Sequence, residues 1–291
     1  MGRLRGLPKG QSLKGREQGV KLSMWTSYFA DMSPEDAVAE IGGLGWTDAE
    51  LSTEHGLALL ERGRADVSGR DFRRDADACD VHVQQGHLDL TVNIAPADEA
   101  DRRRAVDGLK PWLDLYVAAG IVNAVIHPGR APDGGDGQRT DVVLRSLDDL
   151  IDHVGDAPMT FCIENCPSAE AVKALLEASD PVRVGACLDT GHLNLTDERQ
   201  ADYIRWCGPR LKALHLAEND GTGDQHNMPY ARGGSVPWEE IATALREIGY
   251  VGALNYEIPG ERACPLQVRR MKMDYLKCLS AWLFGEPPSL K

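Results

Sequence analysis

The sequence predicts an α/β fold made of a single (β/α)8 barrel, the TIM barrel, over residues 20–285. Three observations predict it. The chain has 291 residues, of which 42% are hydrophobic, and this length suits one such barrel better than two average domains. From residue 20, short apolar runs alternate with longer amphipathic segments, as expected of parallel strands joined by crossover helices. No GxGxxG motif follows the first apolar run, which argues against the competing doubly wound dinucleotide-binding sheet.

Eight short apolar runs are predicted to be the strands of this barrel. In chain order they cover residues 20–26, 47–52, 80–85, 122–127, 159–164, 182–189, 211–216 and 252–257. Between them, apolar residues spaced three and four apart predict helices, including those over residues 34–44, 98–120, 169–178 and 237–249. The first of these helices also carries start signals, because Ser33 is followed by Pro34 and Asp36.

Charge and composition restrict the class of protein. Residues 1–21 carry a net charge of +5 and the rest of the chain −18; residues 1–19 are predicted to be a flexible basic leader. The acidic body argues against nucleic acid as a partner, because it repels a phosphate backbone. No segment has the length and apolarity of a membrane span or of a secretory signal, so we expect a cytoplasmic protein with reduced cysteines. Homo-oligomerisation is left open.

Side chains that bind metals stand at the carboxyl ends of six predicted strands. They are His87, His127, Glu164, Asp189, His215 and Glu257, and successive members are 25 to 42 residues apart, which is roughly one strand–helix unit. A closed barrel would gather them at one mouth, where barrel enzymes have their active sites. So many carboxylates and imidazoles in one pocket need a cation, and the sequence therefore predicts a divalent metal site.

The loop after the seventh strand adds a second group of such residues. Asp224 and His226 lie on this glycine-rich loop, and His192 follows Asp189 by three residues. Two alternatives stay open from the residues alone. Asp224 could cap a turn while His226 is solvated, and Asp189 could cap the helix that follows it.

These residues lie in the motifs GHLDLTVNIA, HPG at 127–129, IEN at 163–165, CLDTGH, LKALHL, DQH and YE. In this order, over residues 20–280, the motifs resemble the xylose isomerase-like barrels, which include sugar isomerases and epimerases, inosose dehydratases and apurinic endonucleases of the endonuclease IV type. The resemblance implies that one metal is bound by Glu164, Asp189, His215 and Glu257. It implies that up to two further ions, or the substrate, are contacted by His87, His127, His192, Asp224 and His226.

The function implied by this resemblance is that of a metal-dependent sugar or polyol isomerase/epimerase, acting on a substrate with or without a phosphate. Glu164 and Glu257 would be catalytic and would exchange a substrate proton through an enediolate. The cofactor would be one to three divalent ions, Mn²⁺, Zn²⁺, Mg²⁺ or Co²⁺, with no other cofactor site. Four aromatic residues could contact the sugar or belong to the core: Trp25, Tyr28, Trp46 and Trp238.

The alternative function is that of an endonuclease IV-like multinuclear zinc phosphoester hydrolase, an AP endonuclease. We rank it second because Gln225 stands where that branch usually has a basic residue, and because residues 193–214 leave little room for a loop that enters DNA. A third hypothesis is a barrel that keeps its metal site only as a structural or sugar-sensing element.

Overall fold

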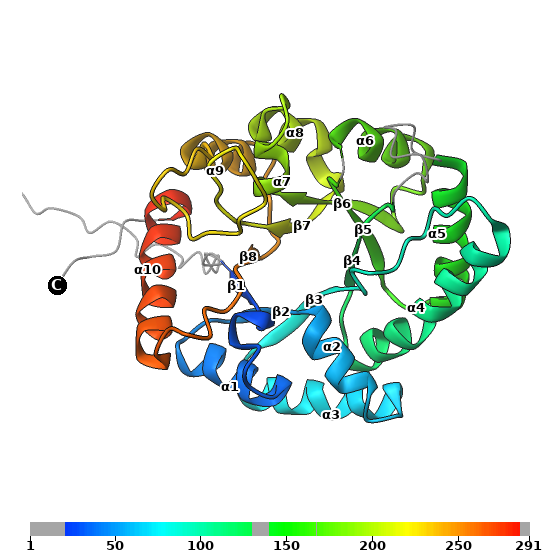
Figure 1. The fold of residues 1–291 in the computed structure, drawn as a ribbon, viewed down its shortest axis with the longest axis horizontal. Helices are drawn as coiled ribbons and strands as arrows, with labels where there is room; N and C mark the ends of the chain where they lie inside the picture. Colours follow the sequence, from blue (N-terminus) through cyan, green and yellow to red (C-terminus); the bar gives the residue numbers. More distant parts are fainter. Residues whose placement is uncertain (1–20, 130–139, 167, 286–291) are drawn as a thin grey trace, which may run out of the picture.

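The computed structural model describes residues 21–129, 140–166 and 168–285, and they form the predicted barrel (Figure 1). Its strands are β1 (Leu22–Trp25), β2 (Asp48–Leu51), β3 (His82–His87), β4 (Asn123–Ile126), β5 (Thr160–Glu164), β6 (Val184–Asp189), β7 (Leu211–His215) and β8 (Leu254–Tyr256). Their order is β7-β6-β5-β4-β3-β2-β1-β8, with parallel pairing throughout. The parallel bridge between Leu216 and Tyr256 joins β7 to β8 and closes the barrel. The predicted leader lies outside the described residues.

The helices form a ring outside the strands (Figure 1). They are α1 (Pro34–Gly43), α2 (Thr53–Leu60), α3 (Ala65–Ala78), α4 (Glu99–Ala119), α5 (Thr140–Val154), α6 (Ala169–Ala178), α7 (Thr190–Asn194), α8 (Gln200–Cys207), α9 (Trp238–Glu247) and α10 (Leu266–Phe284), with 3-10 turns at Thr26–Phe29 and Gly208–Arg210. The start signal of α1 acts as predicted, since the Ser33 hydroxyl accepts the Asp36 N–H at 3.1 Å. Among the described residues, no helix is long and apolar enough to span a membrane.

Side-chain alternation places the polar strand ends inside the barrel. Cys162, Cys187 and Ala213 are fully buried and stand two residues before Glu164, Asp189 and His215. With a period of two, both sets point to the interior, and the small residues form the layer beneath the polar ones. All seven cysteines lie among the described residues, and none of them forms a disulfide.

The third strand ends later than predicted. The sequence predicted a strand over residues 80–85, but β3 runs to His87, because Gly86 pairs with Ala124 and His87 with Val125 of β4. A Cβ on Gly86 would stand only 2.8 Å from the Tyr116 ring, so glycine allows this extension. His87 is therefore held by the sheet itself.

The contact between α3 and α4 supplies a stability prediction. A Cβ added to Gly69 would lie 2.5 Å from the Leu115 carbonyl oxygen and 2.8 Å from the Ala118 Cβ, and backbone cannot move cheaply. We expect Gly69→Ala to lower the free energy of unfolding by about 1–3 kcal/mol in urea titration. Gly108→Ala on α4 is the matched control, because a Cβ there meets nothing within 4 Å, and it should stabilise slightly. Equal effects of the two substitutions would contradict the close packing.

Candidate metal centre

The barrel brings all nine predicted site residues together at its carboxyl-terminal mouth. Six come from strand ends: His87, His127, Glu164, Asp189, His215 and Glu257. His192 belongs to α7, while Asp224 and His226 come from the loop between β7 and α9. Each of the nine side chains lies within 4 Å of another member of the set.

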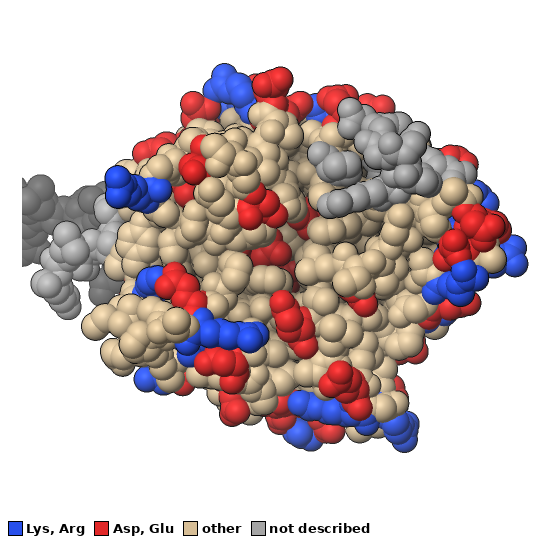
Figure 2. Space-filling model, viewed as in Figure 1, with Lys and Arg blue, Asp and Glu red and all other residues tan. Residues whose placement is uncertain are grey.

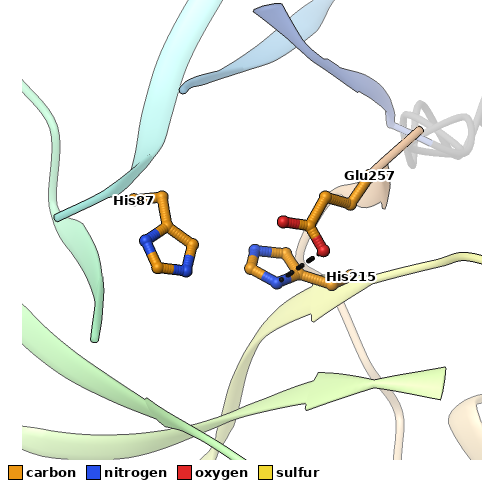
Figure 3. A group of neighbouring side chains, drawn as sticks. All are labelled: His87, His215 and Glu257. Atoms are coloured by element: carbon orange, nitrogen blue, oxygen red, sulfur yellow. Dashed lines mark ion pairs between the residues drawn. The ribbon is translucent and has the colours of Figure 1, made fainter. Parts of the chain in front are cut away.

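The central group consists of Glu164, Asp189, His215 and Glu257. One ligand atom from each lies within 4.8 Å of those of the others, so the four could hold a single ion. His215 Nδ1 stands 3.3 Å from Glu164 Oε2 and 3.3 Å from Glu257 Oε2. Figure 3 shows His87, His215 and Glu257 pointing toward one another from different strands.

The polar atoms of this cluster fit a cation. Asp189 Oδ2, His215 Nδ1 and Glu257 Oε2 are buried without a hydrogen-bond partner, a condition that is rare and costly in folded proteins. Three carboxylates are concentrated here, yet among the described residues no Lys or Arg forms an ion pair with any of the nine. A bound divalent ion would satisfy both the lone pairs and the charge.

Two flanking groups extend the cluster. His87 Nε2 and His127 Nε2 each lie 3.2 Å from Glu164 Oε2, and these three residues could hold an ion. On the other side, Asp224 stands 3.2 Å from His192 Nε2 and 3.0 Å from His226 Nε2. The geometry thus excludes the alternative in which His226 is a solvated histidine. Asp189 does cap α7, through a 2.7 Å hydrogen bond from the His192 N–H to Oδ1, but its second oxygen is left for another partner.

Burial and neighbouring charge separate the two candidate catalytic carboxylates. Burial favours the protonated form of Glu164, but the imidazoles of His127 and His215 outweigh it and hold the pKa of Glu164 well below its usual range. For Glu257, burial prevails and raises the pKa well above its usual range. In the metal-free protein, these opposite shifts favour the ionised form of Glu164 and the protonated form of Glu257.

The histidines predict how metal binding depends on pH. Although burial lowers it, the hydrogen bond with Asp224 raises the pKa of His226 to about 10. The metal-free ring is therefore protonated at neutral pH, and an ion can bind there only by displacing a proton. We expect affinity at this flanking position to rise with pH up to about 10, by roughly tenfold per pH unit for each displaced proton. Chelator competition at pH 6, 7 and 8 measures this, and a pH-independent affinity would contradict it.

The loop that carries Asp224 and His226 is organised by Glu218, which the sequence analysis did not identify. This buried carboxylate accepts the Trp238 Nε1–H at 2.7 Å, the Val236 N–H at 2.9 Å and the Ser235 N–H at 3.0 Å. A strand-like pair of hydrogen bonds with Asn227 adds to this. The loop is thereby held against the barrel. A glutamate three residues after a strand-end histidine was the available signal.

Three of the four aromatic residues considered for sugar contacts belong to the core. Tyr28, Trp46 and Trp238 are at most 1% exposed, and the Tyr28 hydroxyl donates to the Arg269 carbonyl. Trp25 is 7% exposed and lies outside the main core cluster, and its Nε1, like that of Trp46, has no hydrogen-bond partner. A cavity of about 350 Å³ instead opens beside His127, and its other lining residues are Leu90, Thr91, Val92, Asn93, Gly129 and Cys166. That volume suits a small-molecule ligand.

Figure 2 shows the face of the molecule that is seen in Figure 1. Asp and Glu atoms gather in the hollow at the centre, whereas Lys and Arg lie mostly toward the rim. This distribution favours a cation and a neutral or metal-bridged ligand over a bare polyanion. The fold and the site together define a barrel protein with a candidate metal centre at its carboxyl-terminal mouth.

Comparisons with known proteins agree with this class. The family model of the xylose isomerase-like TIM barrel matches residues 36–277. The chain is 30% identical to a D-psicose 3-epimerase of Agrobacterium fabrum, over 83% of this chain and 84% of that protein. It is 46% identical to a D-psicose 3-epimerase of Enterocloster bolteae, over 77% of this chain but 62% of the relative. A "Probable endonuclease 4" of Nitratidesulfovibrio vulgaris is 29% identical, over 54% of this chain and 58% of that protein.

A crystal structure of a D-psicose 3-epimerase in the presence of D-fructose superposes with a TM-score of 0.74 at 18% identity, covering 91% of this chain and all of that one. The two proteins thus share a fold although fewer than one in five of their residues are identical. The chain belongs to the xylose isomerase-like TIM barrel family, which confirms the predicted fold and family. The chain spans about three-fifths of the length of the Enterocloster relative and of the endonuclease.

Proposed function

We propose that the protein is a divalent-metal-dependent epimerase of a keto sugar or a related polyol. The observation that carries the proposal is the pair Glu164 and Glu257, which reach the same atom, His215 Nδ1, at 3.3 Å from two different strand ends. Inverting the configuration of a carbon requires one group that removes its proton and a second group that returns a proton from the opposite side. The two relatives named D-psicose 3-epimerase support the same reaction class.

The residues proposed to hold the metal are Glu164, Asp189, His215 and Glu257. A divalent ion there would polarise the carbonyl and the neighbouring hydroxyl of the substrate. This would lower the cost of removing the proton from the carbon that bears that hydroxyl. We leave its identity among Mn²⁺, Zn²⁺, Mg²⁺ and Co²⁺, because mixed carboxylate and imidazole ligands suit all four. The cavity beside His127 would receive the rest of the substrate.

The chain's own residues would move the proton. One carboxylate removes the proton from the carbon beside the carbonyl, and the electron pair of that bond passes to the carbonyl oxygen, giving an enediolate. The other carboxylic acid then returns a proton to the opposite face, and the carbonyl is restored. Glu164 and Glu257 are at most 5% exposed, so little water reaches either carboxylate. Starting from the other epimer, the two carboxylates exchange roles.

The test is incubation of ketoses, ketose phosphates and inososes with metal-loaded protein in heavy water. An epimerase of this kind places deuterium on the carbon beside the carbonyl, even in substrate that is near equilibrium. Conversion without solvent deuterium would indicate a hydride shift between adjacent carbons instead. No turnover of any of these classes would support the hypothesis of a structural or sugar-sensing metal site.

A second candidate is a multinuclear phosphoester hydrolase, which is favoured by the flanking groups around Glu164 and Asp224. Three ions in such an arrangement could generate hydroxide and stabilise a leaving oxygen. The acidic centre of the mouth (Figure 2) and the net charge of −13 count against a DNA substrate. Metal-dependent nicking of an abasic duplex at physiological salt would reverse this ranking, whereas three bound ions without nicking would not.

A further inference from the structure

Glu50 is a carboxylate inside the barrel that lies outside the candidate ligand set. It is on β2 and is fully buried. Its Oε1 lies 3.0 Å from His215 Nε2, and its Oε2 accepts a hydrogen bond from the Asn255 amide. Among the described residues, no Lys or Arg pairs with it. Burying a carboxylate without a cationic side chain beside it is costly, so the hydrogen bonds to Glu50 must compensate for its loss of hydration.

A chain of hydrogen bonds determines the direction of this contact. The Asn255 NH₂ group donates to the carboxylate of Glu50, and the Asn255 Oδ1 at the other end of the amide accepts the Ser23 hydroxyl at 2.7 Å. Glu50 is thus an acceptor on Oε2, and Oε1 is left to accept from His215. His215 Nε2 must then carry a proton, so Nδ1 is the nitrogen that can offer a lone pair to an ion once the ring is neutral.

We propose that Glu50 is a positioning residue that presents His215 Nδ1 to the metal. The inference rests on the proposed metal site. Nδ1 faces Glu164 Oε2 and Glu257 Oε2 at 3.3 Å each and has no hydrogen-bond partner of its own. By accepting the Nε2 proton, Glu50 selects the tautomer that can bind, fixes the ring plane and makes Nδ1 a stronger donor to the ion.

The length of the side chain is part of the proposal. Glu50 reaches from β2 to β7, two strands that are not neighbours in the sheet. Aspartate at this position would keep the charge but withdraw the carboxylate by one methylene. We therefore expect Glu50→Asp to impair metal binding although it preserves the charge, an effect that a purely electrostatic role would not produce.

The experiment compares Zn²⁺ affinity of the full-length protein and its variants by competition with a chromophoric chelator. Removing such an outer partner typically costs 10–100-fold in affinity, and we expect losses of this order for Glu50→Gln and Glu50→Asp. The matched control is Ser146→Ala. Ser146 is fully buried and donates to the Ile94 carbonyl at 2.8 Å, but it does not contact the cluster, so its removal should leave Zn²⁺ affinity unchanged.

A second readout follows the His215 ring in the Zn²⁺-loaded protein by ¹⁵N NMR. The wild type should show a zinc-bound Nδ1 and a slowly exchanging Nε2–H, and Glu50→Ala should make that N–H exchange rapidly. Zinc on Nε2, or wild-type affinity in both Glu50→Gln and Glu50→Asp, would overturn the positioning role alone. Absence of binding of Zn²⁺, Mn²⁺, Mg²⁺ and Co²⁺ by the wild type would instead remove the metal site and the proposed function with it. If Glu50→Gln does not fold, the Zn²⁺ affinity of Glu50→Asp and the tautomer of His215 in the wild type test the positioning role.

Discussion

Glu257→Gln is expected to reduce interconversion of the two epimers by roughly 10²- to 10⁴-fold, the usual worth of a general acid or base. Glutamine keeps the shape and an oxygen that can bind the metal, but it cannot take or give the proton. With two carboxylates on opposite faces of the substrate, one epimer should still exchange its proton with heavy water through Glu164. The other epimer should lose exchange, and Glu164→Gln should show the reverse pattern.

The measurement is ¹H NMR of each epimer in heavy water, together with the metal content of each variant. Metal content is the internal control, because loss of the ion would explain loss of exchange without any role in proton transfer. A Glu257→Gln protein that retains both its metal and full exchange from both epimers would reduce Glu257 to a ligand. Equal loss of exchange from both epimers with the metal retained would contradict a division of labour between two bases.

His215→Ala is expected to lower metal affinity by more than about 100-fold, because removal of a direct ligand should cost more than the 10–100-fold typical of an outer partner. His215 provides an unpaired Nδ1 between two carboxylates, and alanine leaves those carboxylates facing each other. The barrel should stay folded, since the site lies above the packed layer that contains Cys162, Cys187 and Ala213.

Metal content after gel filtration and the circular dichroism spectrum test this expectation together. His153→Ala is the matched control, because this histidine pairs with Asp114 at 2.9 Å on the outer surface and is remote from the mouth. It should keep the full metal content. A His215→Ala protein with wild-type metal content would contradict the ligand assignment.

Much of the fold could be predicted because local patterns and tertiary structure agree in a parallel barrel. Buried strands appear as short apolar runs, and α1, α4, α6 and α9 begin and end within two residues of the predicted bounds. Their ends are set by side chains next to them in sequence, such as the Asp98 cap and the left-handed Gly120 of α4. The end of β3 was wrong by two residues, because its extension depends on pairing with β4.

Other features could not be read from local sequence. Trp46 and Trp238 are aromatic residues near strand or helix ends, and only packing shows that they belong to the core. Glu218 resembles any loop carboxylate until its hydrogen bonds to the residues around Trp238 are seen. Glu50 stands in a strand whose neighbours in sequence carry no sign of His215, which is 165 residues away.

The sequence alone therefore determined the barrel, the six polar strand ends and the order in which they occur. In a parallel sheet, the residue at the carboxyl end of each strand must face the same mouth, so position along the chain already decides which residues gather. Only the tertiary structure decided how they are oriented. The orientation of the His215 ring, the two oxygens of Asp189 and the partner of Glu50 depend on contacts between distant strands. Local sequence does not specify the directions of these contacts.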